Sequence, residues 1–342
     1  MKPILALTMG DPAGVGAEVC AKALCHDEIY DYCTPVVIGD VEPMRRVIKD
    51  CGLELELNVI PSPADALGRP KTADLIALNT IVDWNYGQVQ ANCGKAAFLY
   101  VEKAIRLAMT GEVDGVVTAP LNKEALHLAG YGQYAGHTEI FTELTGTRDS
   151  AMLLIGGGLR VIHATTHLPL RKACETLSVE RELKVIELAA DVLKKMGIEG
   201  TIAVAGINPH SSENGIFGSE EADVIIPAIE KAREMGIAVD GPVPPDTVFV
   251  KARGGQYPMV VAQYHDQGHI PVKLAGFVMD PATGRFTNLS GVNCTVGLPI
   301  IRTSVDHGTA FDRAGKNSAS EESMLDAIET AIRLAGCTSW RS

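Results

Sequence analysis

Short apolar runs alternate with amphipathic helical patterns along the chain, and this alternation restricts the possible folds more than any other feature. Two segments have the helical pattern: residues 95–109 place apolar side chains on one face, and residues 179–196 run from a Ser178 N-cap to Gly197. The apolar runs have the length of buried strands and lie at 4–9, 35–39, 115–119, 160–166, 201–206 and 259–264. Strands separated by helices predict an α/β fold with a largely parallel sheet. The 342 residues are enough for two domains.

The amino-acid composition argues against some classes of binding partner. The formal net charge is -12 and no segment is rich in lysine and arginine, which argues against a nucleic-acid or anionic membrane surface. No apolar run approaches the roughly 20 residues of a membrane helix, and the run at 4–9 is too short for a signal peptide. The eight cysteines contain no CxxC pair and fit reduced thiols. We therefore expect a cytoplasmic protein that meets anions only in a pocket.

Three histidines follow three of the predicted strands. His167, His210 and His265 each stand at or just beyond the carboxyl end of an apolar run, where open α/β sheets bind their ligands. Taken singly, each is more commonly a histidine that bonds to loop backbone. Their shared placement favours a site for a divalent transition metal such as zinc, manganese, cobalt or nickel, with positions left open for substrate. His163 lies within its strand and is expected in the core.

The stretch YHDQGHIPVKL, residues 264–274, adds a second histidine four positions after the first. Gly268 and Pro271 argue against a helix that would place His265 and His269 on one face. Lys273 and, later in the chain, Arg302 are candidates for binding a phosphate or carboxylate.

The opening LTMGDPAGVGAEV suggests a dinucleotide fingerprint, with Asp40 near the expected place of a ribose-binding acid. Two residues argue against a dinucleotide fingerprint. Asp11 would place a negative charge beside the pyrophosphate, and Pro12 has no backbone N–H to donate to it. We interpret Gly14 and Gly16 as parts of a tight strand-to-helix turn. The segment 278–291 mixes turn formers with few apolar residues and predicts an inserted loop or hairpin.

Eight ordered motifs over nearly the whole chain carry a family resemblance: MGDPAGVGAE, TAPLNKEAL, GHTE, HLPLRKA, GINPH, PPDTVF, YHDQG and GLPIIRTSVDHGTAFDRAGK. The sequence resembles the 4-hydroxythreonine-4-phosphate dehydrogenase family. The resemblance implies NAD-dependent oxidation of a secondary alcohol on a phosphorylated hydroxy acid, followed by loss of carbon dioxide. It also implies two α/β/α domains with a cleft between them, as in isocitrate and isopropylmalate dehydrogenases. We place the first domain at 1–137 and 297–342 and the second at 138–296.

The resemblance also implies a set of site residues and a homodimer whose neighbouring subunit completes each active site. The metal, which could be zinc, manganese, cobalt, nickel or magnesium, falls on the same three histidines, His167, His210 and His265. Two acids, Asp246 and Asp266, match positions expected to orient ligands or move protons. The substrate contacts fall on His137, Thr138, Lys273, Asn293 and Arg302. NAD is expected at the loop 306–316, through His307, Gly308, Thr309, Ala310, Gly315 and Lys316.

The sequence departs from the family pattern at three places: Ala17 replaces a usual proline, His269 replaces an apolar residue, and the 278–291 insertion lengthens the gap between Lys273 and Asn293. Of these, the insertion bears on the substrate. The insertion resembles the second branch of the family, which acts on 4-phospho-D-threonate or 4-phospho-D-erythronate and yields dihydroxyacetone phosphate and carbon dioxide. The alternative is a 4-phosphohydroxy-L-threonine dehydrogenase of pyridoxal phosphate biosynthesis. A dehydrogenase of cis-dihydrodiol dicarboxylates and a non-catalytic protein that binds metal and phosphate also remain open.

Overall fold

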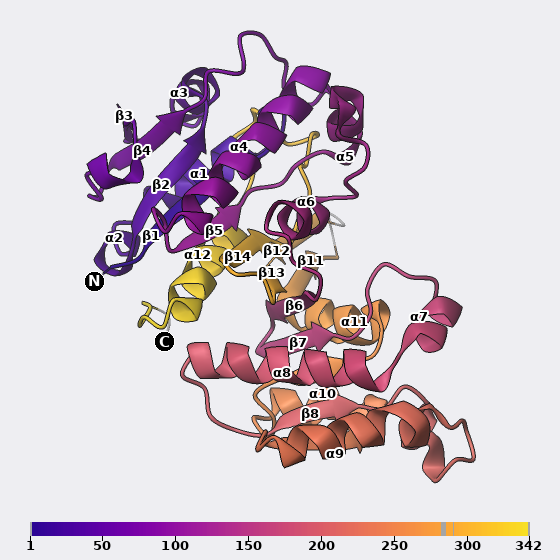
Figure 1. Cartoon of the computed structure of the whole chain (residues 1–342). Coiled ribbons are helices and arrows are strands. Elements are labelled where there is room, and N and C mark those ends of the chain that lie inside the picture. Colours follow the sequence, from indigo (N-terminus) through magenta and orange to yellow (C-terminus); the bar gives the residue numbers. More distant parts are fainter. Residues whose placement is uncertain (1, 282–284, 290, 341–342) are drawn as a thin grey trace. The chain divides into compact units, whose positions relative to one another are not determined.

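The computed structural model describes residues 2–281, 285–289 and 291–340. The chain forms two compact units, the first from Met1–Arg148 and Leu298–Ser342 and the second from Asp149–Gly297. The first boundary lies beyond the expected residue 137, because α6 (His137–Leu144) packs against α4 (Ala91–Met109) in the first unit. Both units combine a sheet with helices, so the α/β class is confirmed (Figure 1).

The sheet of the first unit is parallel throughout the described pairs. Its strands run in the order β3 (Glu56–Val59), β4 (Thr72–Ala77), β2 (Thr34–Gly39), β1 (Ile4–Thr8), β5 (Gly115–Thr118) and β14 (Ile301–Val305). The central strands are buried at nearly every position, which indicates that helices cover both faces. Besides α4 and α6, these helices are α1 (Gly16–Ala23), α2 (Ile29–Tyr32), α3 (Val41–Asp50), η1 (Pro63–Asp65), α5 (Lys123–Leu126), η2 (His127–Tyr131) and α12 (Glu322–Leu334).

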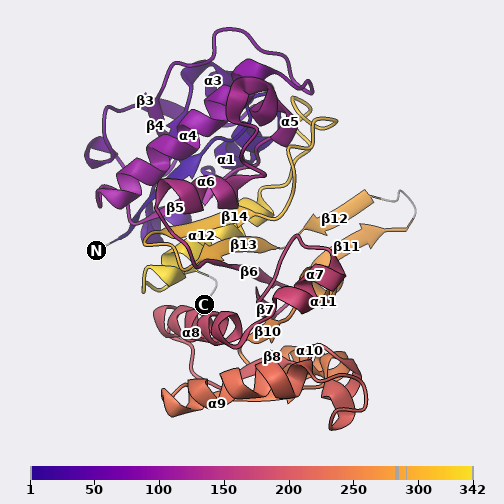
Figure 2. The ribbon, with the colours of Figure 1, turned by 45° about the vertical axis from the view of Figure 1, so that its right-hand side comes forward.

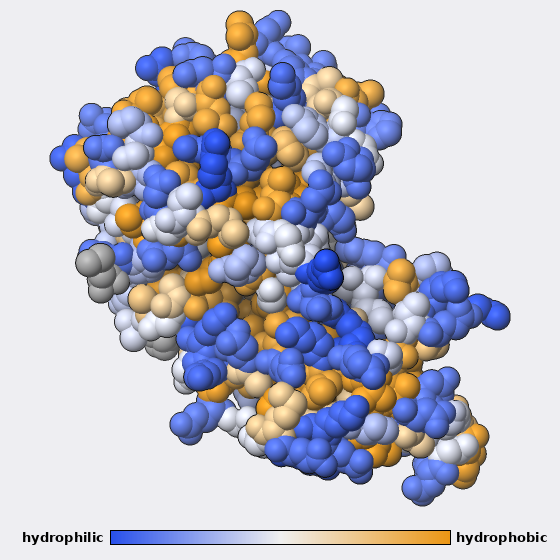
Figure 3. Space-filling view, viewed as in Figure 1, coloured by the Kyte–Doolittle hydropathy of each residue, from blue (hydrophilic) through white to orange (hydrophobic). Residues whose placement is uncertain are grey.

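The sheet of the second unit is mixed. Its strands run in the order β13 (Val292–Val296), β6 (Ala151–Gly156), β7 (Leu159–His163), β10 (Val260–Ala262), β8 (Ile202–Ala205) and β9 (Val239–Val243). The first two pairs are antiparallel and the last three are parallel. Its helices are α7 (Leu170–Thr176), α8 (Val179–Lys195), η3 (Pro209–Glu213), η4 (Glu221–Ile225), α9 (Ile226–Glu234), α10 (Pro245–Arg253) and α11 (His265–Gly276). Figure 3 shows mainly hydrophilic residues along the outer sides of α8 and α9, as expected of amphipathic helices.

The two helices expected from periodicity and the expected insertion are all present. α4 begins a turn earlier than residue 95, and α8 begins after Ser178, whose Oγ accepts a hydrogen bond from the backbone N–H of Arg181 at 3.2 Å. Gly197, with a φ of 64°, follows the end of α8. In the insertion, β11 (Phe277–Asp280) and β12 (Arg285–Leu289) pair as an antiparallel hairpin, which Figure 2 shows standing apart from the sheet.

The helix α11 contradicts one expectation. Gly268 and Pro271 lie inside it, and His265 and His269 stack on one face, with ring centroids 3.6 Å apart. The expectation was wrong because tertiary packing requires the glycine: a Cβ at Gly268 would lie 2.3 Å from Nε2 of His163 on β7. The residue weakens an isolated helix but allows this one to approach the sheet.

We expect Gly268→Ala to lower the free energy of unfolding by roughly 1–3 kcal/mol, because the new methyl group overpacks a buried contact. The added carbon would also lie 2.7 Å from Cγ1 of Val161, so two neighbours would have to move. Urea titration followed by circular dichroism measures the change. Gly254→Ala, at the end of α10, is the matched control, since its φ is -76° and its nearest contact is 3.3 Å. Equal stability of the two variants would contradict the packing argument.

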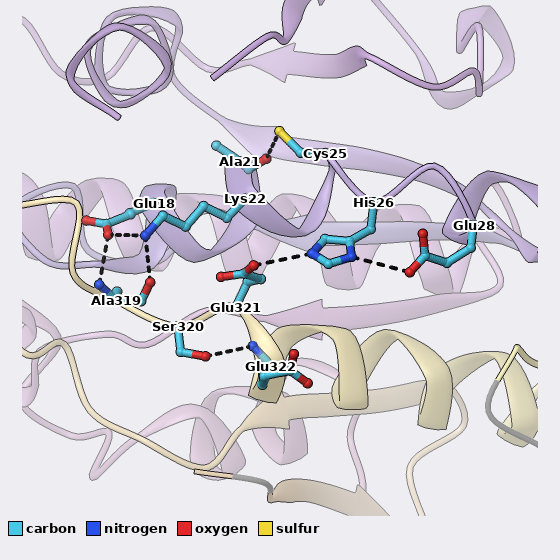
Figure 4. A network of polar contacts seen from close by, with 10 residues as sticks. All are labelled: Glu18, Ala21, Lys22, Cys25, His26, Glu28, Ala319, Ser320, Glu321 and Glu322. Atoms are coloured by element: carbon cyan, nitrogen blue, oxygen red, sulfur yellow. Dashed lines mark hydrogen bonds and ion pairs between the residues drawn. The ribbon is translucent and has the colours of Figure 1, made fainter. Parts of the chain in front are cut away.

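A polar network joins α1 to the chain segment before α12 (Figure 4). Oε1 of the buried Glu18 accepts hydrogen bonds from Nζ of Lys22 at 2.8 Å and from the backbone N–H of Ala319 at 2.9 Å. Lys22 also donates to the carbonyl of Ala319 at 2.7 Å, and His26 lies 3.3 Å from Glu321. The bonds of Glu18 and Lys22 to Ala319 anchor the chain that follows the 306–316 loop.

Across the described part of the chain, every helix is too short or too polar to cross a membrane.

Candidate functional site

The three predicted histidines follow three adjacent parallel strands of the second unit. β10 lies between β7 and β8 and is parallel to both, so their carboxyl ends meet at one edge of the sheet. His167 follows β7, His210 lies in η3 after β8, and His265 is the first residue of α11 after β10. His167 and His210 are exposed and His265 is partly buried.

Two of these histidines lie side by side. The ring centroids of His167 and His265 are 5.4 Å apart. Nδ1 of His265 lies 2.7 Å from Oδ1 of Asp266, which makes this nitrogen the donor and leaves Nε2 with its lone pair. A carboxylate on the far nitrogen is the usual support of a metal-binding imidazole. A pocket of about 260 Å³ opens here and is lined by His167, Leu168, Leu170, Tyr264, His265 and Asp266.

The backbone at two of the histidines is in the left-handed region. His167 has a φ of 45° and His210 a φ of 53°, and the four residues after His210 also have positive φ values. Such conformations cost of order 1–3 kcal/mol per non-glycine residue and gather at binding and catalytic sites. The strain therefore supports a functional role for these two loops.

A buried carboxylate holds the strained loop of His210. Oε1 of Glu221 accepts hydrogen bonds from the backbone N–H groups of Ile207 at 2.8 Å and Asn208 at 2.7 Å. The Asn208 amide donates to Glu220 at 2.7 Å and to the other oxygen of Glu221 at 2.9 Å. These bonds fix the start of the turn in which His210 lies.

The residues fit a divalent metal in part. Imidazole nitrogens with a supporting carboxylate suit zinc and its neighbours in the first transition row. However, the described residues contain no group of three or more histidine, cysteine, aspartate or glutamate side chains close enough to hold a metal. His167 and His265 are together, whereas His210 does not join them in one chain, so the predicted three-histidine set remains a prediction.

His163 and His269 form a pair beneath His265. His163 is fully buried, as expected, and its Nδ1 lies 3.2 Å from the carbonyl of Met152, so it donates there. Its Nε2 lies 3.2 Å from Nδ1 of His269, which shares its N–H between this nitrogen and the backbone carbonyl of His265 at 3.0 Å. Burial, with a smaller contribution from His269, lowers the pKa of His163 to about 3. The ring is thus neutral at physiological pH and acts as a structural acceptor.

One buried polar residue, just after β10, was not among the residues predicted from the sequence. Gln263 is fully buried, and its Nε2 donates to Oε1 of Glu182 in α8 at 3.0 Å and to the carbonyl of Ala205 in β8 at 2.8 Å. Glu182 is also fully buried, and its Oε2 has no hydrogen-bond partner within the described residues. Burial raises the pKa of Glu182 to about 7, against smaller lowering effects of Gln263 and Arg181. The signal was present in the sequence as a glutamine that ends an otherwise apolar strand.

The raised pKa of Glu182 predicts a stability that falls as pH rises. The carboxyl group favours the folded state fully below its unfolded pKa of about 4.5, and this contribution is lost as pH rises to about 7. Relative to wild type, Glu182→Gln should therefore gain about 3 kcal/mol of stability between pH 4 and pH 8. Urea unfolding at several pH values measures the gain. Glu180→Gln is the same change at an exposed position of the same helix turn. It should show no gain and instead a small relative loss, because hydrogen bonds to its own backbone and to Ser178 lower the pKa of Glu180, and equal curves for both variants would contradict the prediction.

The first unit brings together part of the expected anion-binding set. Arg302 on β14 is buried, and its Nη2 donates to Oγ1 of Thr118 at 3.0 Å while its Cζ lies 5.5 Å from the ring centroid of Phe141. His137 begins α6, and burial together with the charge of Arg302 lowers its pKa well below the usual value. Thr138 is the next residue of the same helix. A neutral histidine beside a buried arginine suits a site that binds an oxyanion.

The remaining predicted substrate and acid residues belong to the second unit. Lys273 is in α11, with Nζ 4.6 Å from the ring centroid of Phe277, and Asn293 is in β13. Asp246 is exposed in the first turn of α10. No described bond joins Asp246 to another predicted site residue, so its role stays a prediction.

The loop expected to bind NAD packs on the turn that opens the chain. The carbonyl of Thr309 accepts a hydrogen bond from the backbone N–H of Val15 at 3.0 Å, and a Cβ at Gly14 would lie 2.8 Å from the same oxygen. A Cβ at Gly16 would lie 2.2 Å from the carbonyl of Met9. A side chain at either position would collide with a backbone oxygen, so close packing requires both glycines. This agrees with a tight strand-to-helix turn.

Within the loop itself, the described bonds are mostly local. Nδ1 of His307 lies 2.9 Å from the carbonyl of Gly308, and burial lowers the pKa of His307. Ala310 has a φ of 43°, and a Cβ at Gly315 would lie 2.5 Å from the ring of Tyr86. Lys316 donates to the carbonyl of Asp312 at 2.7 Å. The loop is therefore pre-shaped, while its contact with NAD remains a prediction.

Comparison with known proteins gives one family for nearly the whole chain. The model of the family described as pyridoxal phosphate biosynthetic protein PdxA matches residues 31–331. D-threonate 4-phosphate dehydrogenase of Pectobacterium atrosepticum is 48% identical over 98% of this chain and 100% of its own length.

Two solved structures extend the comparison. A 4-hydroxythreonine-4-phosphate dehydrogenase from Klebsiella pneumoniae is 45% identical, with a TM-score of 0.86 over 98% of this chain and 99% of that chain. A terephthalate 1,2-cis-dihydrodiol dehydrogenase from Burkholderia xenovorans is 32% identical, with a TM-score of 0.69 over 97% and 98%. The likeness to the dihydrodiol enzyme is thus weaker in both sequence and fold.

Proposed function

The chain belongs to the family of the pyridoxal phosphate biosynthetic protein PdxA, and we propose that it catalyses the NAD-dependent oxidative decarboxylation of a 4-phosphorylated four-carbon hydroxy acid. It is a decarboxylating dehydrogenase of this family. The substrate we propose is 4-phospho-D-threonate or 4-phospho-D-erythronate, which would yield dihydroxyacetone phosphate and carbon dioxide. The observation that carries the proposal is the His167 and His265 pair with Asp266 on Nδ1 of His265.

In this proposal, His167, His210 and His265 hold a divalent metal. When bound, the metal supplies Lewis acidity to the reacting hydroxyl and carboxylate oxygens, and NAD supplies the hydride acceptor. Asp266 accepts a hydrogen bond from Nδ1 of His265, which orients the ring and makes Nε2 the ligand nitrogen of its neutral form. Asp246, exposed on α10, is the candidate for moving a proton.

Arg302 and Lys273 are proposed to bind the substrate phosphate, assisted by His137, Thr138 and Asn293. A guanidinium grips an oxyanion through two parallel charge-assisted hydrogen bonds, and an ammonium adds a point charge. Holding the phosphate end would fix the reacting carbon next to the nicotinamide of NAD, whose adenosine part we place at the loop His307–Lys316.

A second copy of the chain is proposed to complete the site. Exposed apolar side chains gather on α11 and β11, next to His265: Ile270 is 62% exposed, Leu274 82%, Val278 54% and Met279 55%. Ile270 and Leu274 are four residues apart and share one helix face. A patch of this kind beside incomplete metal ligands supports a homodimer in which each copy contributes to the other's site.

The proposal is tested by NADH production from the metal-loaded enzyme. The substrates to compare are 4-phospho-D-threonate, 4-phospho-D-erythronate and 4-phosphohydroxy-L-threonine, each with and without a chelator. We expect chelator-sensitive turnover of at least one of the two sugar-acid phosphates. Turnover of the amino substrate alone would favour the second candidate, the activity named for the Klebsiella structure. Turnover of none would overturn the proposed reaction.

A further inference from the structure

Two buried glutamines lie directly behind the three histidine-bearing strand ends. Gln263 at the end of β10 is 0% exposed and Gln267 in the first turn of α11 is 8% exposed. Both reach the end of β8: Gln263 Nε2 donates to the carbonyl of Ala205 and Gln267 Nε2 to the carbonyl of Gly206, each at 2.8 Å. The two glutamines thus bind the strand that leads to His210.

The same glutamines hold β7 and each other. Oγ1 of Thr165 donates to the backbone carbonyl of Gln263 at 2.7 Å, and the side-chain Oε1 of Gln267 accepts from the backbone N–H of Gln263 at 2.7 Å. Thr165 lies two residues before His167, and Gln263 lies two residues before His265. Every loop that ends in a predicted ligand is therefore tied to this pair within a few residues.

Burying the side-chain amides of Gln263 and Gln267 costs free energy, because polar groups lose their contact with water. The preceding strand residues Val260, Val261 and Ala262 are fully buried and apolar, and a methionine would fit the shape of glutamine without desolvating a polar group. Oε1 of Gln263 has no hydrogen-bond partner in the described ranges, so its burial is not fully compensated. In return, the amides make directional contacts that an apolar side chain cannot make. Each hydrogen bond fixes one strand end at a set distance and angle.

We propose that Gln263 and Gln267 are positioning residues that fix the His167, His210 and His265 loops in the places from which, together with a second copy of the chain, they bind metal. The inference rests on the metal site of the proposed function. Neither glutamine would touch the metal or the substrate. They act through the backbone of the three strand ends, by way of Thr165, Ala205 and Gly206.

The test is the binding of Co²⁺ alone to the metal-free full-length protein, followed by its visible absorption spectrum. Gln267→Met keeps the side-chain volume but removes both hydrogen bonds. We expect its Co²⁺ affinity to fall by roughly 10- to 100-fold, as for other residues that orient metal ligands, with an altered ligand-field spectrum. Wild-type affinity together with a wild-type spectrum would overturn the proposal.

A second pair of variants keeps the test decisive if Gln267→Met fails to fold. Thr165→Val removes a single hydroxyl from the network, and Thr165→Ser restores it. We expect weakened Co²⁺ binding in the first and recovery in the second. Equal binding by both would overturn the proposal.

The matched control is Tyr257→Phe, which removes one partly buried hydrogen bond, to Oδ2 of Asp240, in the same unit but away from the histidine loops. It should lower stability and leave the Co²⁺ spectrum unchanged. A spectrum altered as much by Tyr257→Phe as by Gln267→Met would reduce the glutamines to general stabilisers and overturn their positioning role.

Wild type and His265→Ala separate this inference from the proposed function. If wild type binds Co²⁺ and His265→Ala does not, the metal site stands, and the glutamine and threonine variants alone decide the positioning role. If the two bind Co²⁺ equally, the metal site itself is refuted and the positioning role with it.

Discussion

His265→Ala should lose bound metal and turnover together. The change removes an imidazole whose Nδ1 is already committed to Asp266 at 2.7 Å and whose ring lies 5.4 Å from that of His167. Loss of a ligand removes the Lewis acid from the reacting oxygens, an effect worth several kcal/mol, so kcat/KM should fall by at least about 10³-fold. Metal content by mass spectrometry and NADH production measure the two losses.

The control for this variant is His26→Ala in the first unit, where the described contacts of the ring are those to Glu28 and Glu321 (Figure 4). It should retain both metal and activity. A fully active His265→Ala protein without bound metal would remove His265 from the site.

Arg302→Lys should raise KM for the phosphorylated substrate by roughly 10- to 100-fold, with a smaller change in kcat. Lysine keeps the charge but loses the planar fork, and hydrogen bonds to charged groups are worth about 1.5–3 kcal/mol each. The buried place of Arg302, beside Thr118 and His137, leaves little solvent to compensate for the loss. Steady-state kinetics on the phosphorylated acid and on its dephosphorylated counterpart measure the effect.

The comparison between the two substrates identifies the role. Only the phosphorylated acid should become a poorer substrate, so the preference for phosphate should shrink. Arg45→Lys, the same change at an exposed arginine paired with Glu42, should alter neither. An equal loss for both substrates would assign Arg302 to the architecture of the first unit instead of to phosphate binding.

The secondary structure was predictable from the sequence where a segment had a strong local pattern. The six apolar runs all correspond to strands, and α8 begins at its predicted cap, because buried strands and capped amphipathic helices have strong local patterns. Two of the strands that were not predicted have weaker patterns. β3 is half exposed, and β9 contains Gly241 and Pro242, residues that argue against a strand.

The position of the three histidines after strands was predictable, but the contacts that hold their loops were not. Histidines after strands are visible in a sequence, whereas the left-handed turn from His210 to Asn214 contains no glycine to indicate it. The turn depends on Glu221, which is remote enough in sequence to give no local signal. The α11 helix likewise depends on the approach to His163, a tertiary contact that overrides the usual effect of Gly268.

The return of the chain to the first unit has a consequence for synthesis on the ribosome. The second unit is one continuous stretch, Asp149–Gly297, whereas the sheet of the first unit needs β14, whose Ile301 pairs with Gly115. The nascent chain can therefore close the second unit while β5 still lacks its neighbour. Until the last segment emerges, the apolar edge of β5 stays open to other chains, so premature termination would release a product prone to aggregate.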